Sequence, residues 1–200
     1  MGKRTEQMAY TRAAILAAAK QLFAERGFEG TTIRAIAGRA SVGTGTVNLH
    51  FADKTSLLGE AIYGDIAAIL RDLTTSTKTP LDIRLGEIVR PLFEYYARHP
   101  ELSRILVKES LLLRGEWGER FDQQVRQFTK LMEREITSGQ QRGELESGSP
   151  VTTMVEAFLA YYIMLVIEGL RSGEPDPSEL TARFQRLIRL HTRDIPPGAS

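Results

Sequence analysis

The chain has 200 residues, 42% of them hydrophobic, and a formal net charge of +1. This length and composition predict a soluble globular protein of one large or two small domains. The absence of cysteine excludes disulfides, thiol catalysis and thiolate metal sites, and fits a reducing cytoplasm. We expect no signal peptide and no membrane span, because the longest uncharged apolar run, 157–167, is shorter than the ~20 residues a span needs.

Every segment with a recognisable pattern is predicted to be helical. The first helix is expected over about residues 11–25, where Gly27 ends it and Phe28 folds back onto its last turn. Thr31 or Thr32 is expected to cap a short second helix. The apolar residues of that helix share one face: Ile33, Ile36, Ala37 and Ala40.

Residues 41–43 interrupt this periodicity, and Val47 and Phe51 restart it at i and i+4. The positions that face outward between them are mostly small or polar and include no acid: Thr44, Thr46, Asn48, Leu49 and His50. A helix-turn-helix consists of two short helices joined by a tight turn. Its second helix enters the DNA major groove, which the absence of acids on that helix allows. The pattern therefore predicts a sequence-reading DNA-binding protein.

Asp53 is expected to cap a fourth, longer helix that connects this unit to the rest of the chain. Further helices follow from apolar residues that recur every three or four positions: 85–96 with Pro91 inside it, 102–113, 117–136, 151–171 and a last one opening at Asp176-Pro177. A loop is expected over 139–150. No segment has a strand pattern, so the prediction is an all-α chain of about nine helices with a domain boundary near residue 60.

Charge is unevenly distributed along the chain. Residues 1–60 carry eight Lys or Arg against five acids, whereas residues 61–200 carry 18 against 20. The difference is small, but the basic part is the part with the helix-turn-helix pattern. Binding to DNA phosphates requires such positive charge.

Several residues of this pattern stand at fixed spacings: Thr31-Thr32, Ile36-Ala37, Gly45-Thr46-Val47, His50-Phe51, Lys54 and Leu57. Over residues 9–62 the chain resembles the TetR family of bacterial transcription regulators. The resemblance implies an N-terminal three-helix helix-turn-helix DNA-binding domain at 1–60. It also implies a C-terminal helical ligand-binding and dimerisation domain at 61–200, where the likeness is architectural only.

Three positions depart from the family pattern. The family usually has Gly where this chain has Ser41, and often a Ser cap where it has Gly43. Both departures affect the turn, where a serine in a left-handed conformation costs energy. The family also usually has an aromatic residue, commonly tyrosine, where this chain has Asn48, which changes the surface that meets DNA.

The resemblance assigns phosphate contacts to Thr32, Thr46, His50 and Lys54. The positions expected near base edges are Arg34, Thr44, Asn48 and Leu49, and Gly45 allows close backbone approach. An Asn amide can pair with adenine N6 and N7, and a leucine can meet a thymine methyl. The alternative is that Asn48 touches only phosphate or water and Leu49 packs on the rim.

The C-terminal part is rich in aromatic residues, which serve either as core or as the lining of a cavity for a small, mostly apolar ligand. The candidate lining is Phe93, Tyr96, Ile105, Glu109, Trp117, Phe121, Phe128, Phe158 and Tyr162. Glu109 lies on an apolar helix face and needs a partner. That partner is either an arginine, such as Arg104 or Arg90, or a cationic or hydroxylated ligand. Glu168 poses the same question.

The resemblance further implies a two-fold dimer, built from a helix that is apolar on nearly every side and from the last helix. The candidate interface is Leu159, Val166, Leu180, Phe184, Leu187 and Ile188. The dimer would bind a pseudo-palindromic double-stranded operator and act as a repressor. A small-molecule effector would switch it between two states.

The sequence also bears on two other classes of protein. An enzyme is not expected, because His50, His99 and His191 lie far apart in sequence and no nucleophile motif, Gly-rich phosphate loop or metal spacing is present. We therefore expect no metal and no cofactor. The other alternative is a dimeric helical sensor or adaptor that has lost sequence-specific DNA binding, which Asn48 and the altered turn favour.

Overall fold

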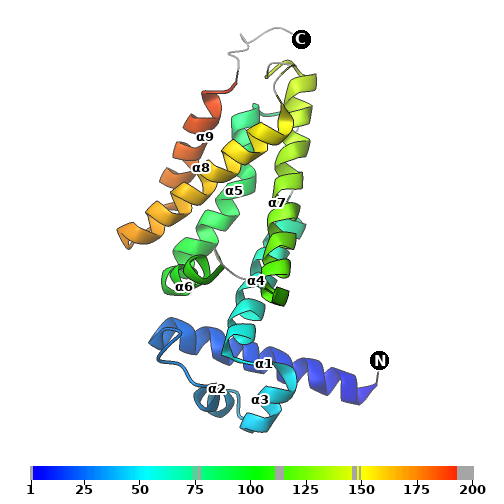
Figure 1. Cartoon of the computed structure of the whole chain (residues 1–200), viewed down its shortest axis with the longest axis vertical. Coiled ribbons are helices and arrows are strands. Elements are labelled where there is room, and N and C mark those ends of the chain that lie inside the picture. The colour runs from blue at the N-terminus through cyan, green and yellow to red at the C-terminus, as the bar shows by residue number, and fades with distance from the viewer. Residues whose placement is uncertain are drawn as a thin grey trace. The chain divides into compact units, whose positions relative to one another are not determined.

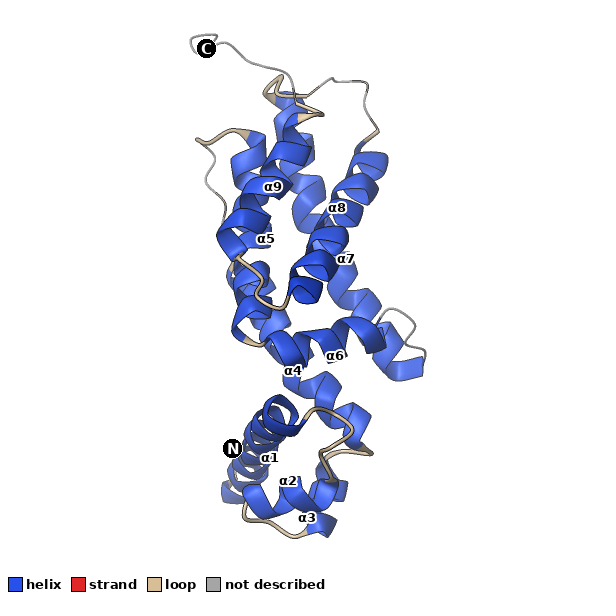
Figure 2. Ribbon diagram, turned by 90° about the vertical axis from the view of Figure 1, so that its left-hand side faces the viewer, coloured by secondary structure: helices blue, strands red, loops and turns tan. Residues whose placement is uncertain are grey.

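The computed structural model describes residues 2–73, 75, 78–110, 115–145, 148 and 150–192, with the backbone alone at 109, 110 and 115–117. Within these residues it contains nine helices and no strand (Figure 2). The helices are α1 (Lys3–Arg26), α2 (Ile33–Arg39), α3 (Thr44–His50), α4 (Lys54–Asp72), α5 (Leu81–Arg98), α6 (Pro100–Ser110), α7 (Gly115–Gln141), α8 (Val151–Ser172) and α9 (Pro177–Arg189). The all-α prediction is confirmed.

The chain forms two compact units. The first unit contains Met1–Ala67 and Glu101–Phe121, and the second contains Ala68–Pro100 and Asp122–Ser200. The first unit thus includes the predicted N-terminal domain, the following residues of α4 and a later segment of α6 and α7. The domain boundary at residue 60 remains a prediction.

Helix α1 begins at Lys3, eight residues before the predicted start. Residues 3–10 are all exposed, so they bury no apolar stripe that a periodicity argument could detect. Gly27, with φ of 71°, ends the helix as predicted. The ring of Phe28 then folds back onto Phe23, with ring centroids 5.5 Å apart.

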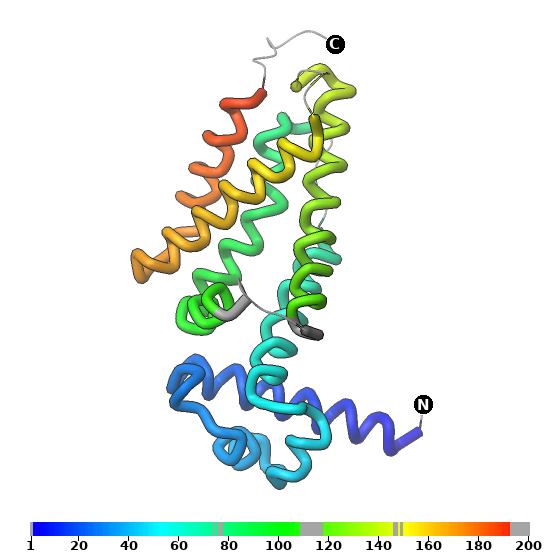
Figure 3. The backbone as a smooth tube through the Cα atoms, in the orientation of Figure 1, coloured from blue at the N-terminus to red at the C-terminus, as the bar shows by residue number. Residues whose placement is uncertain are grey.

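Short connections lead from α1 through α2 and α3 into α4, the blue-to-cyan part of Figure 3. The predicted caps are present. The Ala35 N–H donates to Thr32 Oγ1 over 3.1 Å at the start of α2, and the Ser56 N–H donates to Asp53 Oδ1 over 2.6 Å at the start of α4. The apolar residues of these helices form one core: Ile15, Leu22, Phe23, Ile36, Val47, Phe51 and Ile62.

In the second unit, α5, α8 and α9 pack pairwise against one another (Figure 1). Asp176 caps α9 as predicted, because its carboxylate accepts from the Ser178 and Glu179 N–H groups. Helix α7 extends to Gln141, so Gly139 lies inside a helix and not in the predicted loop. The core contains aromatic residues from four helices, including Phe93, Phe128, Phe158 and Phe184.

Among the described helices, α8 alone is long and apolar enough to cross a membrane, with a window of mean hydropathy 1.6. The uncharged apolar run of α8 is shorter than this window, because the window admits up to two charged residues. In the structure α5 and α9 pack on α8, and Phe158, Tyr162 and Leu165 of α8 are buried. A core helix of a globular protein has the same length and composition.

Candidate functional site

Helix α3 has one face buried in the core and one small face exposed to solvent. Val47 is 0% exposed and Phe51 is 4% exposed, so the apolar side of α3 is anchored in the core. Thr44, Asn48 and Leu49 are exposed, and Leu49 reaches 86% exposure, an unusual position for a large apolar side chain. Each of these residues therefore lies where the sequence pattern placed it, open to a partner that can contact both polar and apolar groups.

The turn between α2 and α3 has the geometry expected from the sequence. Ser41 has φ of 55°, the left-handed region that favours glycine. Gly43 is the N-cap residue of α3, and its position provides no side-chain hydrogen bond to the helix. A serine at 43 would find space, since the nearest heavy atom to a Cβ built there is Thr46 Oγ1 at 3.9 Å. The turn thus has a serine where geometry favours glycine and a glycine where a cap favours serine.

Half of the eight basic residues in 1–60 have partners inside the protein. The contacts are Arg12 with Glu60 at 2.7 Å, Lys20 with Asp65 at 2.6 Å, Arg39 with Glu25 at 2.8 Å, and the Lys54 ammonium with the Phe28 carbonyl at 2.8 Å. Hydrogen bonds from Arg39 lower the pKa of the Glu25 carboxyl. These pairs hold α1 against α2 and α4.

Within the described chain, the other four cations have no ion pair or hydrogen bond from their side chains: Lys3, Arg4, Arg26 and Arg34. Of these, Arg34 lies on α2 and is exposed. The charge available to phosphates is therefore smaller than the sequence count of eight indicated. Among the residues expected to contact DNA, Arg34 is the cation that stays free, whereas Lys54 is already bound.

Known proteins that resemble this chain support a helix-turn-helix at α2 and α3. A family model described as bacterial regulatory proteins of the tetR family matches residues 15–61. The transcriptional repressor KstR2 of Mycobacterium tuberculosis is 34% identical over 102 residues, half of this chain and half of KstR2. The chain thus spans about half the length of curated relatives such as KstR2.

Two solved structures are similar along almost the whole chain. A tetR-family regulatory protein from Rhodococcus RHA1 is 25% identical, with a TM-score of 0.69, and 97% of this chain and 100% of that one are covered. NalD, a repressor of the MexAB-OprM efflux pump in Pseudomonas aeruginosa, is also 25% identical, with a TM-score of 0.68 and coverage of 95% and 100%. Residues 15–61 therefore belong to the TetR family, and the whole chain has the fold of such regulators.

The expected ligand-lining residues are divided between the two units. Phe93, Tyr96, Phe128, Phe158 and Tyr162 lie in the second unit, all buried. Ile105 and Phe121 lie in the first unit and are half-buried. The side chains of Glu109 and Trp117 lie outside the described residues.

Four residues of the second-unit group form a packed aromatic cluster, Phe93, Tyr96, Phe128 and Tyr162, whereas the ring of Phe158 contacts Tyr161 and His191. The Tyr162 ring lies 5.5 Å from that of Phe93 and 4.9 Å from that of Phe128, centroid to centroid. The Tyr162 hydroxyl donates to the Tyr96 hydroxyl over 3.0 Å. Burial raises the pKa of both phenols, well above the usual value for Tyr162, so this pair is neutral at physiological pH. The cluster is thus apolar apart from two hydroxyls that satisfy each other.

Most of the residues expected at a dimer interface are buried within the single chain. Val166, Leu180, Phe184 and Ile188 are at most 5% exposed within the single chain, and Leu159 and Leu187 are half-buried. An amphipathic helix has one apolar face, and α9 uses it against α5 and α8. The buried residues of this stripe are therefore part of the core of the single chain, and the dimer interface stays a prediction.

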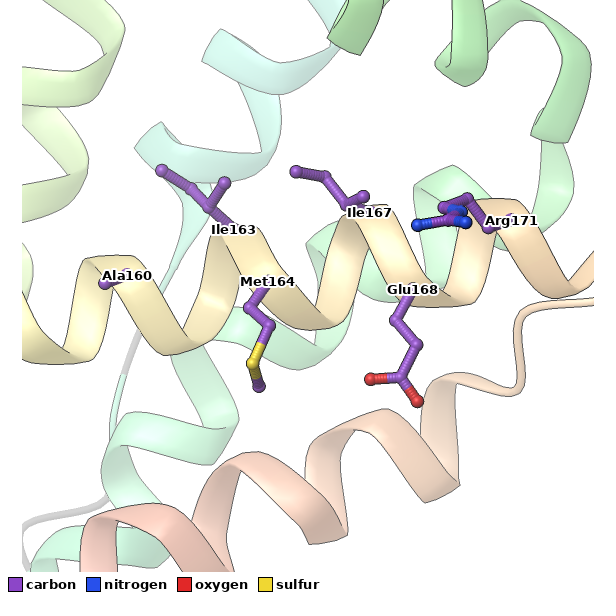
Figure 4. A pocket seen from close by; sticks show the side chains of 6 residues that line it. All are labelled: Ala160, Ile163, Met164, Ile167, Glu168 and Arg171. Carbon is purple, nitrogen blue, oxygen red and sulfur yellow. The ribbon is translucent and has the colours of Figure 1, made fainter.

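A different surface of α8 is apolar and open. A groove of about 660 Å³ is lined by Ala160, Ile163, Met164, Ile167, Glu168 and Arg171. Figure 4 shows Ile163 and Ile167 on one side of the helix and Met164 and Glu168 on the other. Glu168 accepts two hydrogen bonds from Arg183, at 2.6 and 2.8 Å, which gives this carboxylate a partner inside the protein.

Sequence reasoning missed a buried ion cluster in the second unit. Arg84, 1% exposed, pairs with Glu135 at 2.8 Å and with Glu144 at 2.7 Å, and also donates to the Thr79 carbonyl. A signal was present, because Arg84 falls between Leu81 and Leu85 on the buried face of α5. The cluster joins α5 to α7 and to the segment after α7, and has a structural role in the fold.

Proposed function

We propose that this protein is a ligand-responsive DNA-binding transcriptional regulator, a repressor that works as a homodimer on a pseudo-palindromic operator. The observation that carries the proposal is the exposed face of α3, where Asn48 and Leu49 stand out from a helix anchored by Val47 and Phe51. Membership of the TetR family and repressors among the relatives support the same role. A repressor binds chromosomal DNA, so we expect this protein in the cytoplasm.

The exposed face of α3 fits base recognition in the major groove. An Asn amide can donate to and accept from adenine N6 and N7, and a leucine at 86% exposure can meet a thymine methyl group. Thr32, Thr46 and His50 would fix the helix on the phosphates, and Thr44 and Arg34 would lie beside the bases. Gly45, exposed on the same helix, leaves room for the DNA backbone.

The dimer is assigned to the open face of α8. Ala160, Ile163, Met164 and Ile167 offer apolar surface, with Glu168 and Arg171 at one end. A two-fold axis brings the same patch of both protomers together, so opposite charges at its rim can meet their counterparts. A dimer would place two α3 helices about 34–36 Å apart, one turn of DNA.

The effector is assigned to the aromatic cluster of the second unit. A ligand that opened this cluster would meet the Phe93 and Phe128 rings and the hydroxyls of Tyr96 and Tyr162. Such a lining selects a mostly apolar molecule with one or two hydrogen-bonding groups. The ligand must bind the two states of the protein with different affinity in order to switch it.

The experiment that tests this function is selection of bound sequences from a random duplex DNA pool by the purified protein. We expect a palindrome, with an affinity that falls as salt rises because bound phosphates release counterions. Asn48→Ala and Leu49→Ala should each lose preference at one position of each half-site. Failure to enrich any sequence would contradict the proposal and favour the dimeric sensor or adaptor without sequence-specific DNA binding.

A further inference from the structure

Lys54, at the start of α4, is held inside the first unit by two contacts to one residue. Its ammonium donates to the Phe28 carbonyl oxygen over 2.8 Å and lies 4.2 Å from the centroid of the Phe28 ring. Lys54 is half-buried and stands 26 residues from Phe28 in sequence. A cation over an aromatic face that also donates to a carbonyl is attracted by both groups.

Phe28 lies at the turn that follows α1. Its ring packs on Phe23, which is fully buried, and its carbonyl also accepts from the Thr31 N–H over 3.2 Å. The Thr31 hydroxyl in turn donates to the Leu22 and Gly27 carbonyls, at 3.0 and 2.8 Å. The turn that Lys54 contacts is therefore part of a hydrogen-bonded segment, and this segment leads directly into the N-cap of α2.

We propose that Lys54 is a positioning residue for DNA binding, and that its ammonium does not neutralise a phosphate. It fixes the turn between α1 and α2 against the start of α4, and so sets where α2 and α3 stand. The Phe28 carbonyl takes one of the three ammonium N–H groups and the Phe28 ring lies against the ammonium, so a phosphate would compete with these contacts. This inference rests on the proposed DNA-binding function.

The test measures how DNA affinity depends on salt. The slope of log K against log salt falls by about 0.9 for each phosphate contact that is lost. The probe is the duplex recovered by selection, bound by wild type and by Lys54→Met and Lys54→Arg. We expect Lys54→Met to bind on the order of tenfold more weakly at every salt concentration, about 1.4 kcal/mol, with the wild-type slope. Arginine at 54 should restore the affinity, since it can keep both contacts.

Phe28→Leu provides a second variant that leaves every charge in place. If Lys54 acts through Phe28, then Phe28→Leu weakens binding with an unchanged slope, and the double variant with Lys54→Met is no weaker than Lys54→Met alone. Lys20→Met is the matched control, because it removes the same charge from the pair with Asp65 in the same unit. We expect its slope to equal that of wild type.

The outcomes separate the two proposals. A wild-type protein that binds no duplex refutes the proposed function, and this inference with it. A wild type that binds, with a slope lower by about 0.9 in Lys54→Met, refutes only the positioning role. Wild-type affinity for the duplex in Phe28→Leu or in Lys54→Met would also refute the positioning role of Lys54. Circular dichroism at the assay temperature confirms that each variant is folded.

Discussion

Replacement of Ser41 by glycine should stabilise the protein. Ser41 has φ of 55°, the one non-glycine residue with positive φ in the described chain. An L-residue in this region brings its Cβ close to the following carbonyl oxygen. Ser41 is exposed, and within the described residues its hydroxyl has no hydrogen-bond partner. Its N–H donates to the Gly38 carbonyl over 3.2 Å, a bond that glycine keeps.

Two opposing terms set the size of the effect. Relief of the left-handed conformation is worth about 1–2 kcal/mol. Glycine loses more backbone freedom on folding, which costs roughly 0.5–1 kcal/mol. The expected net gain is about 0.5–1 kcal/mol in the free energy of unfolding, or a melting temperature higher by roughly 1–4 °C for a chain of this size.

The assay is urea unfolding followed by circular dichroism at one protein concentration, with the midpoint as the measured quantity. Ser41→Ala is the matched control, since it removes the hydroxyl but keeps the Cβ, and should give no gain. Gly27→Ser makes the reverse exchange at φ of 71° and should lower the midpoint. A midpoint for Ser41→Gly that equals or falls below those of wild type and Ser41→Ala would refute the argument.

Four further predictions concern other parts of the structure. Asn48→Ala should reduce discrimination against the wrong base at one operator position by about 1–3 kcal/mol, measured with single-position duplex variants, whereas an equal loss on all sequences would show phosphate contact only. Arg84→Met should destabilise the protein by about 3–5 kcal/mol in urea, because two carboxylates lose their buried partner; an unchanged midpoint would contradict this. Burial raises the pKa of Glu144, but the hydrogen bond and charge of Arg84 outweigh it and the net shift is downward from 4.5. The ionised form is thus favoured on folding, so this stability is present above pH 4.5 and is lost as pH falls through the folded pKa. Glu144→Gln should remove that part of the acid dependence of the urea midpoint. Met164→Asp should convert a dimer to a monomer in sedimentation velocity, whereas Met8→Asp, at a similarly exposed methionine of α1, should not; a dimer that persists in Met164→Asp would exclude the α8 face.

Much of the fold could be predicted because helix signals are local. Caps at Thr32, Asp53 and Asp176 involve residues two or three positions apart, and the apolar stripes repeat every three or four positions. The same locality explains why the exposed face of α3 was predicted correctly. The start of α1 was not, because residues 3–10 bury nothing and so have no periodic signal.

The sequence by itself determined the helices, the helix-turn-helix and the strained turn at Ser41, since each depends on neighbours within a few residues. Only the tertiary structure decided which charges are free to meet a ligand. Lys54 binds Phe28 across 26 positions, and Arg84 binds Glu135 and Glu144 across 51 and 60. Tertiary structure likewise buried the apolar face of α9 against α5 and α8, and left a second apolar face of α8 open. Partners so far apart meet only when helices pack, and no local spacing encodes that meeting.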